Sequence, residues 1–319
     1  MHDSPTLSDM EEIEARITAA MAESALLAGL EVTEAIRIVA GNRAILRGTL
    51  NGRAVVLRLF LAKPQIAESE GAEMTRLWAY MHDGCARVAE PIAVLPAHGL
   101  IVMAALEGPT LMQALRACEN RTEQALLLPP AAEWLRRYTK PTEERVPANP
   151  ARWLDRAREA AATQPFPRLR ELEAVILTHM ARLTKEIDGR QWRTAICHGD
   201  YHVANLIVTE AGPPPVLTGI DLGGSARLPV YKDIARFLTH MARRGPRPSG
   251  RRAFGVDLAG VQAFTESYAL DPEERRLCLP FFLCFEALIR VENPSLSDGR
   301  ISRAEAMAQG LIAGLEGLD

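Results

Sequence analysis

The residues of this chain that are best suited to chemistry lie in one short segment, 197–208, which reads CHGDYHVANLIV. Asp200 stands in a glycine-containing loop, Asn205 follows just before an apolar stretch, and Asp221 comes at the end of the next one. Phosphoryl transfer needs one carboxylate to orient the acceptor hydroxyl and two further oxygen ligands to hold Mg²⁺. The spacing therefore predicts a phosphoryl-transfer site, with Asp200 as catalytic residue and Asn205 and Asp221 as metal ligands.

The continuation of this segment strengthens that interpretation. The pattern His-Gly-Asp-x-His-x-x-Asn is followed by Ile-Asp-x-Gly at 220–223 and by YKDIA at 231–235. Together these motifs resemble the aminoglycoside phosphotransferase superfamily, whose members share a bilobal protein-kinase-like fold and include choline, homoserine and thiamine kinases. The resemblance is specific from His198 to Ala235, and it extends over the rest of the chain only in the order of its elements.

The resemblance implies an activity and its co-substrates. The chain is expected to move the γ-phosphoryl group of ATP or GTP to a hydroxyl group of a small molecule, with Mg²⁺ as cofactor. His198 is expected to hold the catalytic loop, and Asp233 to brace it by accepting backbone N–H bonds. The role of His202 stays open between packing within the loop and lining the acceptor site. A bare His-Gly-Asp stretch is also compatible with a simple turn, since Gly and Asp favour turns.

The N-terminal part of the chain supplies the expected nucleotide-binding groups. Gly41, Asn42 and Arg43 form a turn whose backbone N–H groups could cradle phosphate oxygens, although a plain hairpin turn gives the same pattern. Arg58 occupies the strand position at which kinases usually carry a lysine, and the period of two along the strand predicts that it points to the same face as that lysine. It is expected to neutralise the nucleotide phosphates. Arginine is always charged and binds phosphate with a planar fork. Lower activity or an altered nucleotide preference stays open.

Three further positions complete the expected nucleotide site. The helix after the Arg58 strand offers Glu70 and Glu73 as partners for the guanidinium, and Glu70 is preferred. Met103 and Ala105 fall where the linker between the lobes should hydrogen-bond a purine edge, and strand packing also explains their apolar character. The choice between ATP and GTP is left open.

The elements that must position these residues divide the chain into two parts. Residues 1–105 are expected to form a nucleotide-binding lobe with a leading helix, which starts at a Ser8 and Glu11 capping box. Residues 106–319 are expected to form a mainly helical lobe that carries the catalytic loop. The whole predicts an α+β fold with a small antiparallel sheet, in which Asn51-Gly52 forms a hairpin turn. The expected elements are a helix to residue 27, strands at 35–40, 44–50, 54–60, 88–95 and 100–105, a helix at 69–81, an exposed loop at 141–150, and short strands at 194–197, 206–209 and 216–220.

Composition excludes several other classes of protein. Hydrophobic residues make up 48% and charged residues 24% of the chain, as in an ordinary globular protein. The net charge of −3 argues against a general nucleic-acid binder. Five cysteines without a Cys-x-x-Cys pair argue against a disulfide framework or a zinc site. An acidic N-terminus and the lack of a long apolar run predict a cytoplasmic protein without integral membrane association. The oligomeric state stays open.

The acceptor and two rival functions also stay open. The arginines within 241–254 could attract an anionic substrate or a membrane surface, and a solvated loop is the simplest explanation for them. A cationic acceptor would need carboxylates, which the C-terminal segment offers at Glu286, Glu292, Glu316 and Asp319. One rival function is a nucleotide-binding pseudokinase with a regulatory role. The other is a kinase of a lipid-linked saccharide or a protein, of which the protein is disfavoured because no Ala-Pro-Glu segment follows Asp221.

Overall fold

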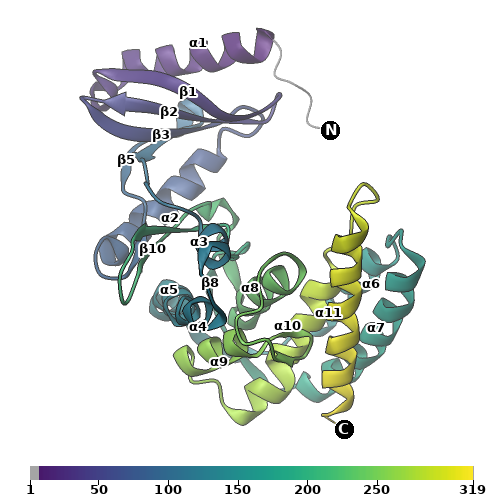
Figure 1. The fold of residues 1–319 in the computed structure, drawn as a ribbon. Coiled ribbons are helices and arrows are strands. Elements are labelled where there is room, and N and C mark those ends of the chain that lie inside the picture. The colour runs from purple at the N-terminus through teal and green to yellow at the C-terminus, as the bar shows by residue number, and fades with distance from the viewer. Residues whose placement is uncertain (1–6, 319) are drawn as a thin grey trace. The chain divides into compact units, whose positions relative to one another are not determined.

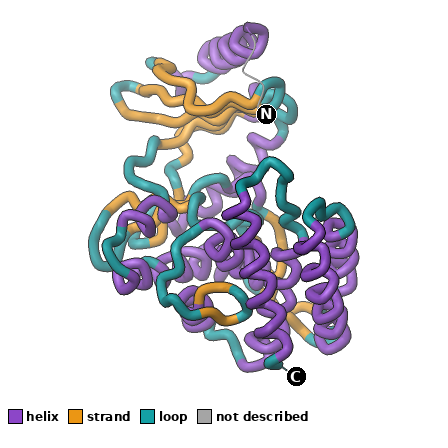
Figure 2. The backbone as a smooth tube through the Cα atoms, turned by 45° about the vertical axis from the view of Figure 1, so that its right-hand side comes forward, coloured by secondary structure: helices purple, strands orange, loops and turns teal. Residues whose placement is uncertain are grey.

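The computed structural model describes residues 7–318, which pack as two compact units (Figure 1). Unit 1 contains the described residues up to Gly108 together with Thr218–Ser225, and unit 2 contains Pro109–Leu217 and the chain from Ala226 onward. An antiparallel sheet dominates unit 1 and helices dominate unit 2, as the colouring of Figure 2 shows. This confirms the predicted α+β fold class. The assignment of Thr218–Ser225 to unit 1 differs from the expected division, which placed every residue after 105 in the helical part.

Unit 1 is built on one five-stranded sheet of order β1-β2-β3-β6-β5, whose neighbouring strands are all antiparallel. The hairpin between β2 and β3 turns at Asn51 and Gly52, which have φ values of 51° and 80° as a tight hairpin turn requires. This confirms the predicted hairpin. The elements are α1 (Leu7–Glu23), β1 (Leu30–Val39), β2 (Arg43–Leu50), β3 (Arg53–Phe60), α2 (Ile66–Met81), β4 (Ala86–Val88), β5 (Pro91–Leu95) and β6 (Leu100–Ala104).

Several element boundaries in unit 1 differ from the prediction, among them the start of β1, which lies at Leu30 rather than at residue 35. Helix α1 already includes Leu7, so Ser8 is not its N-cap, and α1 ends at Glu23 before a separate 3₁₀ turn at Ala25–Leu27. The single strand expected at 88–95 is divided into β4 and β5. Pro91 begins β5, where the missing N–H of proline costs no ladder hydrogen bond.

The core of unit 1 explains which way Arg58 points. Leu57 and Leu59 of β3 are fully buried in one cluster with Ile13 and Ile17 of α1. Successive side chains of a strand point to opposite faces of the sheet. Arg58 therefore leaves β3 on the face opposite to α1, as the period of two predicted.

Unit 2 is a helical assembly around the apolar helix α10, every residue of which is buried. Helices α6, α7, α8 and α11 pack against α10 (Figure 1). Among the described helices, none combines the length and the apolarity needed to cross a membrane. The elements are α3 (Leu111–Ala117), α4 (Arg121–Leu126), α5 (Leu128–Thr139), β7 (Glu144–Pro147), α6 (Ala151–Ala161), α7 (Pro167–Ile187), β8 (Gln191–Cys197), β9 (Leu206–Glu210), β10 (Val216–Gly219, which leads into unit 1), β11 (Ala226–Pro229), α8 (Val230–Arg244), β12 (Arg252–Ala253), β13 (Val256–Asp257), α9 (Leu258–Ser267), α10 (Leu279–Leu288) and α11 (Asp298–Glu316).

The prediction of an exposed loop at 141–150 was partly wrong. Glu144–Pro147 form β7, which pairs antiparallel with β8, and β11 pairs with β8 on its other side. The sequence ERVP looks like a loop because charged residues and proline are rare in strands. Proline and exposed charges are nevertheless tolerated on an edge strand, which is the place of β7 in the sheet.

Glu173 on α7 is a buried carboxylate that should make the stability of the protein depend on pH. The side chain of Gln164 donates to one of its oxygens at 2.7 Å, and the other oxygen has no hydrogen-bond partner among the described residues. Burial raises the pKa of Glu173 to about 7, and the hydrogen bond from Gln164 opposes this increase. The folded chain therefore keeps a proton that the unfolded chain loses near pH 4.5, so stability falls as the pH rises from about 4.5 to about 7.

Glu173→Gln is expected to remove this pH dependence. The gain in the free energy of unfolding above about pH 7 should reach up to about 3 kcal/mol, because each pKa unit corresponds to about 1.4 kcal/mol. Thermal unfolding of both proteins below pH 5 and above pH 7 measures the effect. Glu171→Gln, which changes an exposed carboxylate on the same helix, is the control. An identical pH dependence in wild type and Glu173→Gln would contradict the prediction.

Candidate active site

The loop after β8 is held by two charged side chains from the first turn of α8. The carboxylate of Asp233, which is fully buried, accepts the N–H of Gly199 at 3.1 and 3.2 Å to its two oxygens. The amine of Lys232 donates to the carbonyl oxygen of Gly199 at 2.8 Å. Gly199 has a φ of 83°, a left-handed conformation that favours glycine. Gly199, the residue before Asp200, is thereby held at both its N–H and its carbonyl group, and Asp233 makes the backbone N–H contact that the sequence predicted for it.

His198 is buried among aromatic rings behind this loop. Its ring lies 6.1 Å from that of Trp134, 6.2 Å from that of Tyr138 and 5.9 Å from that of Tyr201, measured between centroids. The hydroxyl of Tyr201 donates in turn to a backbone carbonyl of α5 at 2.6 Å. These contacts fit the structural role expected for His198.

Asp200 lies in a strongly positive environment. The Nε of Arg236 donates to its Oδ1 at 2.7 Å, a guanidinium nitrogen of Arg290 lies 3.4 Å from the same oxygen, and the Nε2 of His202 lies 3.5 Å from Oδ2. Burial acts to raise the pKa of Asp200, but the hydrogen bond from His202 and the charge of Arg236 outweigh it and lower the pKa well below its usual range. Asp200 is therefore a fully ionised and weakly basic carboxylate.

His202 is itself supported by a second histidine on α8. The rings of His202 and His240 stack with their centroids 4.4 Å apart and their planes at 10°. Burial lowers the pKa of His240 to about 2, and the neighbouring charges of His202 and Arg236 add to this effect. A neutral His240 can stack on His202 without placing another charge beside Asp200. His202 thus both packs within the loop and approaches the carboxylate of Asp200.

Asn205 is fixed by the backbone of the same loop. Its amide nitrogen donates to the carbonyl of Asp200 at 3.0 Å, and only 8% of the residue is exposed. No described residue donates to its Oδ1, which leaves an amide oxygen to accept a cation. Mg²⁺ prefers oxygen ligands of this kind, so the donor set of Asn205 fits the expected metal.

In unit 1, Arg58 joins two carboxylates. It forms a hydrogen-bonded ion pair with Glu70 of α2, and its second guanidinium nitrogen donates to Oδ1 of Asp221 at 2.8 Å. Glu73, the alternative partner, pairs with Arg76 instead. Burial raises the pKa of Glu70, and the charge of Arg58 opposes this. The ion pair with Arg58 therefore counteracts part of the cost of burying the charge of Glu70.

Asp221 has a left-handed backbone, with a φ of 64° and a ψ of 54°. Among residues with a Cβ atom, Asn and Asp adopt this conformation most readily. Its side chain is 42% exposed, and one of its oxygens is bonded to Arg58. The remaining oxygen is a hard ligand, so Asp221 also fits a magnesium site. Asn205 belongs to unit 2, so the structure describes the two candidate ligands in separate units.

The turn between β1 and β2 is already bound to a carboxylate of its own chain. Gly41 has a φ of 58°, and its N–H donates to Oδ1 of Asp9 on α1 at 2.8 Å. The carbonyl of Asn42 accepts two backbone N–H groups from the segment after β3. The charge of Arg43, like that of Arg58, opposes the increase in the pKa of Glu70 that burial causes. The N–H of Gly41 thus points at an anionic oxygen, as it would when cradling a phosphate.

The two residues expected at the purine edge differ in what they can offer. Met103 lies in β6 and is 8% exposed. The N–H of Ala105 already donates to the carbonyl of Ala54 at 3.1 Å. If Ala105 contacts a purine in this conformation, it does so through its carbonyl oxygen.

The arginine cluster within 241–254 is not simply a solvated loop. Helix α8 continues to Arg244, and Arg243 is buried. The guanidinium of Arg243 donates to the carbonyls of Ala287 and Arg290, both at 2.8 Å, at the C-terminal end of α10. A cation at this place stabilises the carbonyls that a helix end leaves unpaired. Arg247, Arg251 and Arg252 are exposed beyond the helix.

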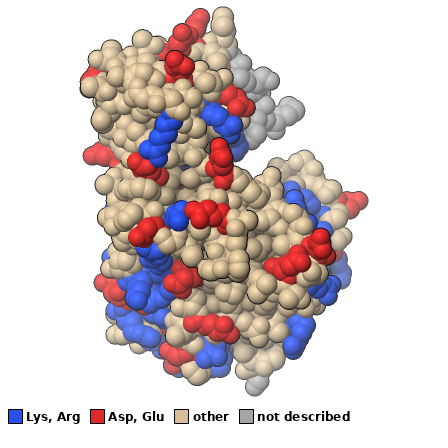
Figure 3. Space-filling view, turned by 60° about the vertical axis from the view of Figure 1, so that its left-hand side comes forward, with Lys and Arg blue, Asp and Glu red and all other residues tan. Residues whose placement is uncertain are grey.

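The carboxylates considered for a cationic acceptor are not available as a group. Glu286 is fully buried, with Lys232 and Arg290 at 3.5 and 3.3 Å from its oxygens. Glu292 lies 3.4 Å from Arg243. Asp319 lies outside the described residues. On the face shown in Figure 3, basic and acidic side chains are interspersed, as the near-neutral composition suggests.

Sequence reasoning missed Arg236 and Arg290, the two guanidiniums at Asp200. A signal was present for Arg236, because it stands one helical turn after Lys232 and Asp233, on the face of α8 that already contacts the loop. No comparable signal exists for Arg290, which follows the end of α10 and reaches Asp200 only through the packing of α10 against α8.

Comparison with known proteins agrees with this geometry. The model of the phosphotransferase enzyme family, APH, matches residues 32–269. No curated protein matches the sequence significantly. A putative aminoglycoside phosphotransferase from Ralstonia eutropha JMP134 has 15% identity over 96% of this chain and 98% of its own, with a TM-score of 0.59. A microcompartment-associated aminopropanol kinase has 15% identity over 95% and 96%, with a TM-score of 0.59, and an amicoumacin kinase has 14% identity over 95% and 96%, with a TM-score of 0.57. At these identities the solved structures show the shared kinase-like fold.

Proposed function

The chain belongs to the phosphotransferase enzyme family, and on that premise we propose that it transfers the γ-phosphoryl group of ATP or GTP to a hydroxyl group of a small molecule, with Mg²⁺. The observation that carries the proposal is Asp200, an ionised carboxylate on a loop fixed by Asp233 and Lys232. Catalysis of phosphoryl transfer rests mainly on positioning and charge neutralisation. A loop held in place by these contacts, with an ionised carboxylate at its tip, meets the first of these needs.

Asp200 would orient the acceptor hydroxyl by accepting its hydrogen bond. The hydroxyl oxygen then bonds to the γ-phosphorus, the bond from that phosphorus to the bridging oxygen breaks, and the nucleoside diphosphate leaves. The hydroxyl proton passes to Asp200 as the new bond forms. Because its pKa is low, Asp200 accepts this proton only late, when the hydroxyl oxygen has lost most of its basicity. Arg236 holds one carboxylate oxygen at 2.7 Å and fixes the direction of the other.

Arg58 and the turn at Gly41 are proposed to bind the nucleotide phosphates, with Glu70 holding the guanidinium of Arg58 in place. Arginine binds phosphate through two parallel N–H donors, so Arg58 could replace its contact with Asp221 by a contact with phosphate. Asn42 and Arg43 would complete the turn over the phosphates. Met103 and Ala105 are proposed to lie at the purine edge.

Asn205 and Asp221 are expected to hold Mg²⁺, which would neutralise the charge of the phosphates when bound. Each offers an oxygen that accepts no hydrogen bond from a described residue. Crystals grown with Mn²⁺ and a non-hydrolysable nucleotide should show anomalous density within bonding distance of both side chains. Asn205→Ala should weaken Mn²⁺ binding in a titration with nucleotide present, whereas Asn149→Ala, at an exposed position of unit 2, should not. Metal density at neither side chain would contradict the assignment.

A nucleotide-consumption screen tests the proposed function itself. The full chain is incubated with Mg²⁺, ATP or GTP, and separate sets of aminoglycosides, amino alcohols, sugars, hydroxy acids and nucleosides. Acceptor-dependent release of nucleoside diphosphate, with a phosphorylated product seen by mass spectrometry, is the expected result. Nucleotide binding without turnover on any set would instead support the pseudokinase alternative.

A further inference from the structure

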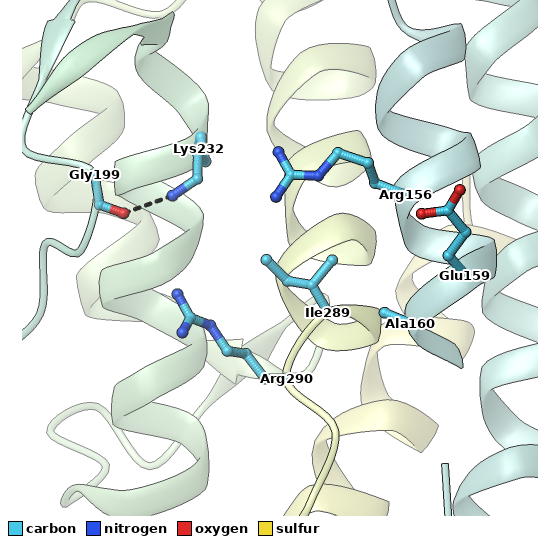
Figure 4. Close-up of a pocket in the computed structure, with 7 residues that line it drawn as sticks. All are labelled: Arg156, Glu159, Ala160, Gly199, Lys232, Ile289 and Arg290. Atoms are coloured by element: carbon cyan, nitrogen blue, oxygen red, sulfur yellow. Dashed lines mark hydrogen bonds between the residues drawn. The ribbon is translucent and has the colours of Figure 1, made fainter. Parts of the chain in front are cut away.

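Unit 2 contains a cavity of about 590 Å³ beside the catalytic loop (Figure 4). Its walls come from α6, from Gly199 of the loop, from the start of α8 and from the two residues that follow α10. The volume is that of a small-molecule site. Because Gly199 directly precedes Asp200, the cavity lies where a molecule that presents a hydroxyl to Asp200 can be accommodated.

The charged groups of this cavity are mostly cationic. Arg156, Lys232 and Arg290 line it together with a single carboxylate, that of Glu159. Figure 4 shows the guanidinium of Arg156 extending toward the side of the cavity where Lys232 and Arg290 lie, and Glu159 on the far side of the Arg156 side chain from Lys232. The amine of Lys232 is directed at the carbonyl oxygen of Gly199. An anion in this space would meet the guanidiniums of Arg156 and Arg290, whereas the amine of Lys232 is already bound to Gly199 and lies 3.5 Å from Glu286.

These cationic side chains differ in how many ion pairs and hydrogen bonds they already form within the protein. No described carboxylate lies within 4 Å of the exposed side chain of Arg156, whose guanidinium lies over the rings of Trp153 and Phe285. Arg290 contacts Glu286 at 3.3 Å and Asp200 at 3.4 Å, distances longer than those of a strong charge-assisted hydrogen bond. Since a guanidinium has five N–H donors, Arg290 keeps donors for a ligand.

The position of Arg290 sets the spacing that a ligand would need. One of its nitrogens lies at Asp200, the group expected to orient the acceptor hydroxyl, while its side chain also lines the cavity. A ligand that places its hydroxyl at Asp200 and an anionic group at Arg290 needs only a short chain between them. Arg156, across the cavity, could bind a second oxygen of the same anionic group (Figure 4).

A second cavity, of about 300 Å³, adjoins the first through Ile289 and Arg290. Its lining adds Arg236, Arg243 and Arg244 together with one carboxylate, that of Glu292, which lies 3.4 Å from Arg243. Burial lowers the pKa of Arg244, and the positive charges of Arg300 and Arg236 lower it further. A bound anion would reduce the repulsion between these positive charges, and a bound cation would increase it.

We infer that the acceptor of this kinase is anionic: a small hydroxyl compound whose carboxylate or phosphate group binds Arg156 and Arg290 while its hydroxyl lies at Asp200. The inference rests on the proposed function, and it narrows the acceptor class. Polycationic acceptors are disfavoured, because their ammonium groups would meet arginine and lysine where they need carboxylates.

Matched acceptors test the inference. Glycerate, glyceramide and 3-amino-1,2-propanediol place an anionic, a neutral and a cationic group on one skeleton, and gluconate, gluconamide and glucamine do so on a longer one. Comparing glycerol 3-phosphate with glycerol tests whether a phosphate group can serve in place of the carboxylate. The anionic member is expected to have a kcat/KM at least tenfold above that of its neutral match. Equal rates within each set, or a preference for the amine, would overturn the inference while leaving the kinase function intact.

Variants assign the preference to the cavity. Arg156→Gln should reduce the anionic preference at least tenfold, and Arg156→Glu should shift it toward the amine. Arg158→Gln makes the same change on the same helix at an exposed residue outside the cavity, and it should keep the preference. The same preference in Arg156→Gln as in wild type would remove Arg156 from the site and overturn the inference.

A binding measurement separates failure of the inference from failure of the proposed function. Sulfate, used as an oxyanion probe, is titrated against the full chain, and the thermal midpoint is recorded without nucleotide. Sulfate should stabilise wild type and Arg158→Gln more than Arg156→Gln. If no acceptor is turned over but this difference is found, the anion site stands and the kinase proposal falls. An equal sulfate effect in all three proteins would overturn the anion site.

Discussion

Asp200→Ala is expected to lower kcat by about 10²–10⁴-fold on any acceptor that the wild-type protein phosphorylates, the range typical for a positioned acid or base. Asp200 is the one carboxylate on the loop that Lys232 and Asp233 clamp, and no replacement oxygen would remain at its place. Nucleotide affinity should change little, because the expected phosphate-binding groups belong to unit 1. Steady-state kinetics and calorimetric titration with nucleotide measure the two effects separately.

Two controls make the Asp200 result interpretable. Asp200→Asn keeps the shape of the side chain and its contact with Arg236 while it removes the charge, so it should lose activity without loss of thermal stability. Asp155→Asn removes a carboxylate from the exposed face of α6 and should leave kcat unchanged. Turnover by Asp200→Ala within tenfold of wild type, about 1.4 kcal/mol in the barrier, would exclude a catalytic role.

Arg58→Ala is expected to weaken both nucleotide binding and the fold of unit 1. Loss of a charge-assisted contact with phosphate, worth about 1.5–3 kcal/mol, corresponds to an increase in nucleotide Kd of about 10–150-fold. The variant also leaves Glu70 buried without its partner, and removing one member of a buried ion pair costs about 3–5 kcal/mol of stability. Calorimetric titration and chemical unfolding measure the two losses.

Arg58→Lys tests whether the positive charge alone is sufficient or whether the two parallel N–H donors of the guanidinium are needed. A lysine keeps the charge and can pair with Glu70, but it lacks the two parallel donors that also reach Asp221. It should therefore recover stability, and it should recover nucleotide binding if a single point charge is sufficient. Arg47→Ala, at an exposed site on β2, is the matched control. Nucleotide affinity and rate of Arg58→Ala equal to those of wild type would remove Arg58 from the proposed site.

Local patterns predicted most of the fold and much of the loop. The alternation in β3 determined the face of Arg58, and Asn-Gly determined the hairpin before it, because both depend on neighbouring residues alone. The contact of Asp233 with Gly199 followed from the motif. The preference for Glu70 over Glu73 agrees with the structure. Glu70 is only 2% exposed, whereas Glu73 is paired with Arg76 of the same helix.

The rest depends on packing between distant segments, which no local pattern encodes. Arg290 reaches Asp200 from 90 positions away, and Asp9 reaches Gly41 from 32. The pairing of β7 with β8 likewise depends on distant segments, because the polar sequence of β7 does not itself indicate an edge strand beside β8. The buried role of Arg243 was missed for the same reason, because the carbonyls that it caps belong to another helix.

Thr218–Ser225 belong to unit 1 although they follow residues 109–217 of unit 2 in the sequence, so unit 1 is completed late in synthesis. During synthesis, residues 1–108 emerge first, and the segment that carries Asp221 emerges only after residues 109–217. Until then Arg58 can pair with Glu70 but lacks its second carboxylate. Domains tend to fold as units during translation, and this one is completed late, from a segment that follows most of unit 2. A fragment ending at Gly108 would contain all five strands of the sheet but lack Asp221, so the proposed nucleotide site cannot be tested by cutting the chain between its two units.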